Sequence, residues 1–134
     1  MQDAMQDAMR RFFDAFIDAF ASFDGTLIAE RYAAPYLAFD AAGEARLFTC
    51  HADIGAYFQG IVDQYFADGC RACRFHTLQV TPLGAGAALA SLSWELLDAR
   101  AEVLGGWRES YNLIRTANGW RIGVSTDHAN ASDT

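Results

Sequence analysis

Hydrophobic residues at the start of the chain recur at helical spacing. Met5, Met9, Phe12, Phe16 and Phe20 follow one another at intervals of three or four residues, and charged side chains fill the opposite stripe. The pattern predicts an amphipathic helix over residues 1–23 that packs its phenylalanines into the core.

The middle of the chain alternates between helical and extended patterns. Residues 26–32 fit a short second helix, and Pro35 favours an extended segment over 36–40 because it disfavours the helical conformation of the residue before it. Gly43 marks a turn into a return strand at 46–49. Helical spacing then resumes over 51–68, with Gly69 as its C-terminal cap.

After Gly69 the hydrophobic period changes to two, which is typical of strands. We expect four strands at residues 73–81, 87–97, 107–116 and 120–128. The pair Asn118-Gly119 is a strong hairpin signal. The order of elements predicts an α+β fold in which three helices cover one face of a curved antiparallel sheet.

Turn positions suggest how these strands pair. A two-residue loop at Gly84-Ala85 pairs Arg74 with Glu95 and Phe75 with Trp94. A loop at Asn118-Gly119 pairs Trp120 with Ala117, and therefore Glu109 with His128.

The sequence leaves two alternatives for the turn between the second and third of these strands. A tight turn at Ala99-Arg100 pairs Ala90 with Glu109, and a bulge at Gly105-Gly106 would shift this pairing by one residue. Without the shift, one row of the inner face reads Gln79, Ala90, Glu109, His128, and the next reads Thr81, Ala88, Tyr111, Thr126.

Composition narrows the class of protein. The chain has 134 residues and a net charge of -7, which fits one domain over 1–134 with a frayed tail at 129–134. The acidic balance argues against nucleic acid or anionic membrane as partner. All ten basic residues are arginine, so Schiff-base lysine chemistry is excluded. Neither a secretory leader nor a spanning segment is evident, and we expect a cytoplasmic protein.

These features resemble the nuclear transport factor 2-like superfamily, in particular its SnoaL-like branch. The resemblance covers roughly residues 9–128 and is carried by the Phe-rich first helix, the segment Arg31-Tyr32-Ala33-Ala34-Pro35, the helix at 56–69, and the ending Tyr111-Asn112-Leu113 … Asn118-Gly119-Trp120-Arg121-Ile122. It implies a cone-shaped α+β barrel with a pocket between sheet and helices, and frequent homodimers. Relatives include ketosteroid isomerase, scytalone dehydratase and polyketide cyclases, whereas others only bind or assemble.

Candidate catalytic residues follow from the predicted inner face. A Glu109–His128 pair could hold a base, Tyr111 could donate a hydrogen bond to an oxyanion, and Asp40 ends the first strand near where an isomerase-like base would sit. The alternative is a structural ion pair. Candidate ligand-binding residues share the inner face or are aromatic: Gln79, Ala88, Ala90, Trp94, Trp107 and Tyr57.

We expect neither a metal nor a cofactor. Cys70-x-x-Cys73 with His76 suggests zinc, but strand positions 73 and 76 point to opposite faces. The sequence thus predicts a domain that binds a small apolar or amphipathic molecule, acting as a cofactor-free isomerase, dehydratase or cyclase, or as a non-catalytic binding or assembly module. Apolar residues expected on the outer sheet face, Leu78, Val80 and Leu89, favour a homodimer.

Overall fold

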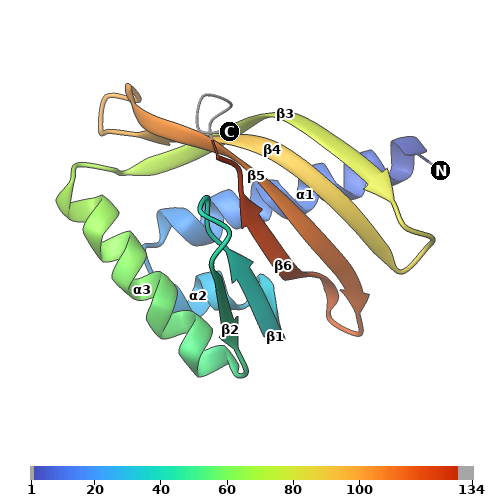
Figure 1. Cartoon of the computed structure of the whole chain (residues 1–134). Helices are drawn as coiled ribbons and strands as arrows, with labels where there is room; N and C mark the ends of the chain where they lie inside the picture. Colours follow the sequence, from blue (N-terminus) through green and yellow to red (C-terminus); the bar gives the residue numbers. More distant parts are fainter. Residues whose placement is uncertain (1, 130–134) are drawn as a thin grey trace.

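A curved, unclosed sheet of six strands forms the frame of the protein, with strand order β2-β1-β6-β5-β4-β3 (Figure 1). The computed structural model describes residues 2–129. Its helices are α1 (Gln2–Ala21), α2 (Gly25–Ala29) and α3 (His51–Ala67). Its strands are β1 (Tyr32–Phe39), β2 (Ala45–Phe48), β3 (Ala72–Pro82), β4 (Ala87–Leu97), β5 (Val103–Thr116) and β6 (Gly119–Asp127).

The predicted α+β class is confirmed, with one addition. Neighbouring strands pair antiparallel except β1 and β6, which run parallel. Strand β1 starts before Pro35, at Tyr32, and its pairing with β6 is interrupted between Tyr32 and Leu37. Pro35, which has no N–H to donate, lies in that gap.

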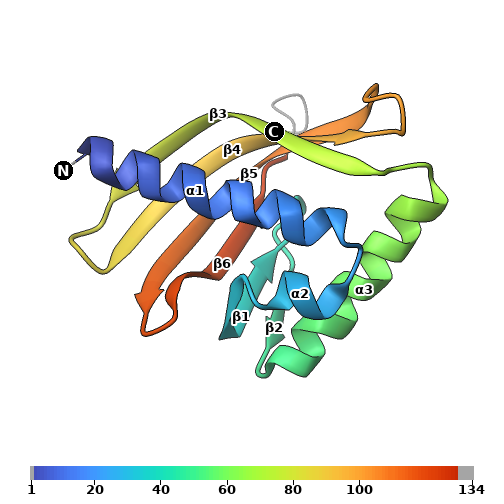
Figure 2. The same cartoon turned by 180° about the vertical axis from the view of Figure 1, so that it is seen from behind.

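Helix α1 crosses one face of the sheet (Figure 2). Its apolar stripe is buried as predicted, and Met9 and Phe13 have no exposed surface. The centre of the Phe13 ring lies 5.1 Å from that of Tyr111 and 6.1 Å from that of Trp94. Burial of such large aromatic side chains dominates the energy of a small core, so α1 is held mainly by this stripe.

Helices α2 and α3 pack through glycines. Asp24 caps α2 by accepting a hydrogen bond from the Thr26 N–H at 2.9 Å. A Cβ at Gly25 would lie 2.2 Å from the Gly55 carbonyl oxygen, so only glycine permits this backbone approach. Helix α3 ends before Gly69, whose φ of +98° is the conformation that its predicted role as a cap requires.

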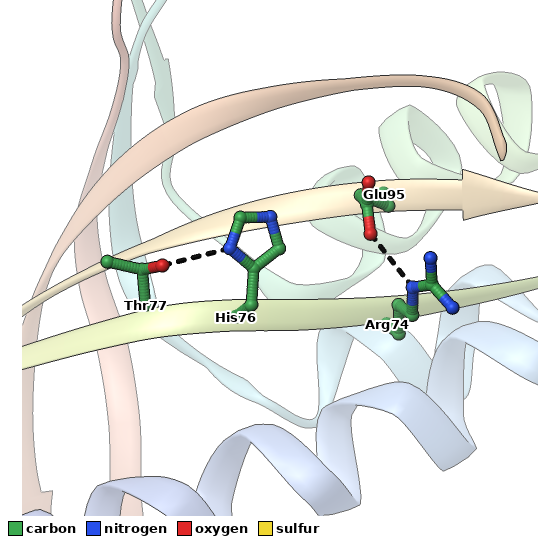
Figure 3. Close-up of polar contacts among 4 residues, drawn as sticks. All are labelled: Arg74, His76, Thr77 and Glu95. Carbon is green, nitrogen blue, oxygen red and sulfur yellow. Dashed lines mark hydrogen bonds and ion pairs between the residues drawn. The ribbon is translucent and has the colours of Figure 1, made fainter.

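The first part of the β3–β4 register is confirmed (Figure 3). Arg74 pairs with Glu95, and Arg74 Nε lies 2.8 Å from Glu95 Oε1. A bulge at Thr77, which has a φ of +56°, then shifts the register. Beyond it Leu78 and Val80 turn toward the core, and Gln79 turns to solvent.

The other two predicted registers are wrong. A wide turn after Asp98 and an irregularity beyond Val103 pair Ala90 with Tyr111, and Glu109 with Leu92. In the last hairpin the loop is Ala117-Asn118, one residue earlier than predicted, so Trp120 pairs with Arg115.

A further bulge in β6 explains the pairing of Glu109. Leu113 pairs with Ile122 and Asn112 with Val124, which leaves Gly123 as the extra residue. Together the two shifts pair Glu109 with Asp127 instead of His128.

The frayed tail predicted at 129–134 lies outside the described residues, except for Ala129. No helix within residues 2–129 is long and apolar enough to cross a membrane.

Candidate functional site

A cavity of about 200 Å³ lies between the sheet, the second half of α1 and helix α3. Aromatic side chains form about half of its lining, and they include Phe16, Phe20, Tyr57, Phe58, Tyr65 and Trp107. The β1–β2 hairpin contributes Asp40, Glu44 and Arg46, which are exposed and mark the mouth. The cavity therefore has an apolar interior and a charged entrance.

Glu109 is the carboxyl group most deeply buried in this wall. Strand β5 points it inward, and its Oε1 accepts a hydrogen bond of 2.8 Å from the Trp107 indole N–H. Burial, followed by the charge of Asp127, raises the pKa of Glu109 well above its ordinary value. At neutral pH this environment favours the protonated, neutral form of Glu109.

Asp127 is paired directly with Glu109 across β5 and β6, and its charge is a cause of the raised pKa of Glu109. Asp127 is half-buried, and burial raises its pKa too. Two neighbouring carboxyl groups in a partly buried site cannot both ionise cheaply, so the pair favours the state that holds one proton. The more exposed Asp127 is the member that carries the negative charge more readily.

Tyr111 completes the support of this pair. Its hydroxyl oxygen accepts a 2.8 Å hydrogen bond from the Trp94 indole N–H, and the nearby hydroxyl lowers the pKa of Glu109, against the effect of burial. Trp94 therefore orients the Tyr111 hydroxyl, and the Trp107 indole holds Glu109 in place.

Six of the predicted site residues line the cavity. They are Glu109, Tyr111, Asp40, Trp94, Trp107 and Tyr57. Asp40 is exposed at the mouth, where its Oδ1 accepts hydrogen bonds from the backbone N–H groups of Ala42 and Glu44. The Arg46 guanidinium lies 5.7 Å from the centre of the Tyr57 ring.

The other predicted site residues lie elsewhere. The Glu109–His128 pair is wrong, because the loop and the Gly123 bulge direct His128 to the outer face, where its Nε2 is 2.7 Å from Ser110 Oγ. Gln79 is also on the outer face and accepts a 2.8 Å hydrogen bond from Arg108. Ala88 and Ala90 are buried in the core but do not line the cavity.

Sequence reasoning missed two inward-facing polar residues of β6, Ser125 and Asp127. Ser125 forms a hydrogen bond with the Tyr36 hydroxyl in the cavity wall. An available signal was Gly123, because a glycine inside a strand pattern often marks a bulge. Allowing for one bulge there turns both residues inward.

The described part of the chain holds no cluster of metal ligands. Residues 2–129 contain no group of three or more His, Cys, Asp or Glu side chains arranged to bind a metal ion. Cys70 and Cys73 are buried free thiols, and burial raises the pKa of Cys73 to about 12. Neither thiol is therefore a ready thiolate ligand or nucleophile.

A curved sheet with helices on one face and a cavity between them defines a cone-shaped domain of the NTF2-like class. The chain belongs to the family described as NTF2-like protein (DUF6841), whose model matches residues 6–130. The SnoaL-like branch is not singled out by this match. No curated protein matches the chain.

Solved structures share the fold at low identity. Aln2 from a Streptomyces species is 15% identical, with a TM-score of 0.78, and the match covers 97% of this chain and 94% of that one. An NTF2-like protein of unknown function from Pseudomonas putida is 20% identical, with a TM-score of 0.72 and coverage of 96% and 88%. An NTF2-like protein from Novosphingobium aromaticivorans is 18% identical, with a TM-score of 0.74 and coverage of 93% and 81%.

Proposed function

We propose that the protein binds a small, largely apolar molecule in the aromatic cavity and moves a proton on it with the Glu109–Asp127 pair. The observation that carries this proposal is that buried Glu109 and half-buried Asp127, directly paired on neighbouring strands, both line the aromatic cavity. Perturbed carboxyl groups at a cavity are characteristic of acid–base sites.

The size of the cavity limits the ligand. A buried apolar cavity of about 150 Å³ is enough to bind benzene. The cavity of about 200 Å³ therefore suits one six-membered ring with a small substituent. A molecule with several fused rings would need the walls to move.

The two carboxyl groups fit complementary roles. Asp127 in its ionised form takes a proton from a carbon next to a carbonyl group, and Glu109 in its protonated form donates a hydrogen bond to the oxygen on which charge develops. Return of the proton from Asp127 to a different carbon completes an isomerisation without any cofactor. Trp107 holds Glu109 in place during this cycle.

A β,γ-unsaturated cyclohexenone is a suitable probe, because it has one ring and its conjugated isomer is followed by ultraviolet absorbance. We expect the native chain to accelerate isomerisation and both Glu109→Gln and Asp127→Asn to lower the rate by ~10²–10⁴-fold. Glu102→Gln is the matched control, because Glu102 lies exposed in the β4–β5 turn. Equal rates for all four chains would contradict the proposed proton transfer.

The second candidate is a binding module without catalysis. It is favoured by the bulky side chains Phe16, Phe20, Trp94 and Trp107, which line the cavity and leave little room for a moving substrate. In that case the probe's saturated analogue, cyclohexanone, binds with the same affinity to the native chain and to Asp127→Asn, and no isomerisation occurs. Binding and turnover measured on the same samples distinguish the two candidates.

A further inference from the structure

A second hollow is lined by α1 residues between Ala4 and Ala15, whereas the aromatic cavity is lined by Phe16 and Phe20 of the same helix. It occupies about 630 Å³ between α1, the β3–β4 turn, the end of β5 and the start of β6. Four arginines line it: Arg11, Arg31, Arg115 and Arg121. We call it the arginine groove.

This concentration of positive charge is unusual for so acidic a chain. The protein has seventeen acidic and ten basic residues, and four of the ten basic residues lie in this groove. Within residues 2–129 the ion pair of the structure joins Arg74 to Glu95, and no groove arginine takes part in one. Burial and then the charge of Arg31 lower the pKa of Arg121, and Glu30 only partly offsets them.

Aromatic rings and backbone hold these guanidinium groups in place. Arg31 lies 5.5 Å from the centre of the Phe12 ring, and Arg115 lies 5.9 Å from the centre of the Trp120 ring. Arg121 donates a 2.7 Å hydrogen bond to the Trp120 carbonyl oxygen. Each guanidinium has five N–H donors, so most remain available to a ligand. Arg31, Arg115 and Arg121 are therefore held in place before any anion arrives.

We propose that the arginine groove binds a small organic anion, one phosphate or carboxylate group joined to a compact apolar body. Guanidinium groups bind both oxyanions through paired hydrogen bonds, and the apolar body rests on Ala8, Phe12 and Ala85. The volume falls in the usual range of small-molecule sites, about 300–1,000 Å³. Nucleic acid is disfavoured as occupant because the whole chain carries a net charge of -7.

Phenyl phosphate is the probe, followed by calorimetry with inorganic phosphate and benzoate as comparison ligands. We expect phenyl phosphate to bind more weakly as salt increases, and the double variant Arg31→Gln/Arg121→Gln to lose about tenfold or more in affinity. Arg100→Gln makes the same type of charge change at the exposed β4–β5 turn and should bind like the native chain. If benzoate binds better than phenyl phosphate, the anion is a carboxylate.

Unfolding temperatures separate lost binding from lost folding. The double variant should unfold close to the temperature of the native chain without ligand, because the loss of the Arg31–Phe12 contact and of the Arg121 hydrogen bond is offset by relief of repulsion between Arg31 and Arg121. Phenyl phosphate should raise the unfolding temperature of the native chain and of Glu109→Gln, but not that of the double variant. Equal stabilisation of the double variant, no binding by the native chain, or equal affinity for inorganic phosphate would overturn the proposal as stated.

Discussion

Glu109 and Asp127 occupy directly paired positions of β5 and β6, and both line the aromatic cavity. The pair combines a buried acid with a half-buried one, so the two members have different access to water. That difference is what assigns the proton to Glu109 and the negative charge to Asp127.

The pH dependence of stability provides a first test of this pair. The pKa of Glu109 rises from 4.5 to about 8 on folding, so the folded state binds more protons than the unfolded state between these values. The stability that Glu109 contributes should be fully present below pH 4.5 and be lost as pH rises to about 8, by on the order of 1 kcal/mol per pH unit. Urea unfolding at a series of pH values measures this slope.

Glu109→Gln should flatten that slope, because the amide does not titrate. Glu102→Gln should keep it, because Glu102 is exposed. A native chain whose stability rises steadily from pH 5 to 8 would show that Glu109 is ionised in the folded state.

Trp107→Phe tests the hydrogen bond that holds Glu109. The indole N–H stabilises the ionised carboxylate and lowers its pKa, so its removal should raise the pKa of Glu109 further, by about one pH unit. Carbon-detected NMR titration of the carboxyl signal measures the change. Trp120→Phe is the control, since Trp120 lies in the arginine groove, and it should leave the pKa of Glu109 unchanged.

Two glycines of the α2–α3 region should respond to alanine in opposite directions. Gly25→Ala places a Cβ 2.2 Å from the Gly55 carbonyl oxygen, so the helices must separate, at a cost of about 1–3 kcal/mol or more. Gly60 is exposed in α3 with open space around it, and Gly60→Ala should stabilise by up to about 1 kcal/mol. Thermal unfolding compares both variants, and an unchanged midpoint for Gly25→Ala would contradict the close packing.

A homodimer through the outer sheet face stays a prediction, now with a smaller apolar surface. Leu78 and Val80 turn inward, whereas Leu89 and Ile114 are 44% and 39% exposed. We expect sedimentation at micromolar concentration to report a dimer that Leu89→Arg dissociates. Leu47→Arg, on β2 and 63% exposed, should leave it intact. Sedimentation of the native chain as a monomer would contradict this prediction.

Helices and strands are predictable from periodicity, because each buries a long, regular stripe. The predicted bounds of β4 match the observed ones, and the predicted end of α3 lies within one residue of the observed end. The Arg74–Glu95 pairing also follows from a correctly placed turn. Local sequence carries this information because the hydrophobic period and the turn residues are themselves local.

The candidate site is less predictable, because it depends on register summed over several turns and bulges. The Asn-Gly rule places the last loop one residue late, since Thr116 pairs with Gly119 and its hydroxyl closes the turn. Thr77 forms a bulge with a φ of +56°. A β-branched residue rarely adopts this conformation, so the sequence around Thr77 does not predict a bulge there. Glu109 is correctly placed on the inner face because its own strand is regular there, whereas its partner lies beyond a bulge.

The extra residue at Gly123 determines how this chain must be aligned with its relatives. In a relative whose last strand has no bulge, the residue that faces the same part of the cavity comes one position sooner after the equivalent of Ile122. An alignment without gaps would set that residue against Thr126, which is exposed, and would set Asp127 against a residue on the far face. A relative with an acid at the same place in the cavity would then seem, in the alignment, to lack the equivalent of Asp127. The acid pair should therefore be sought among relatives by superposing backbones, or by allowing a one-residue gap inside this strand.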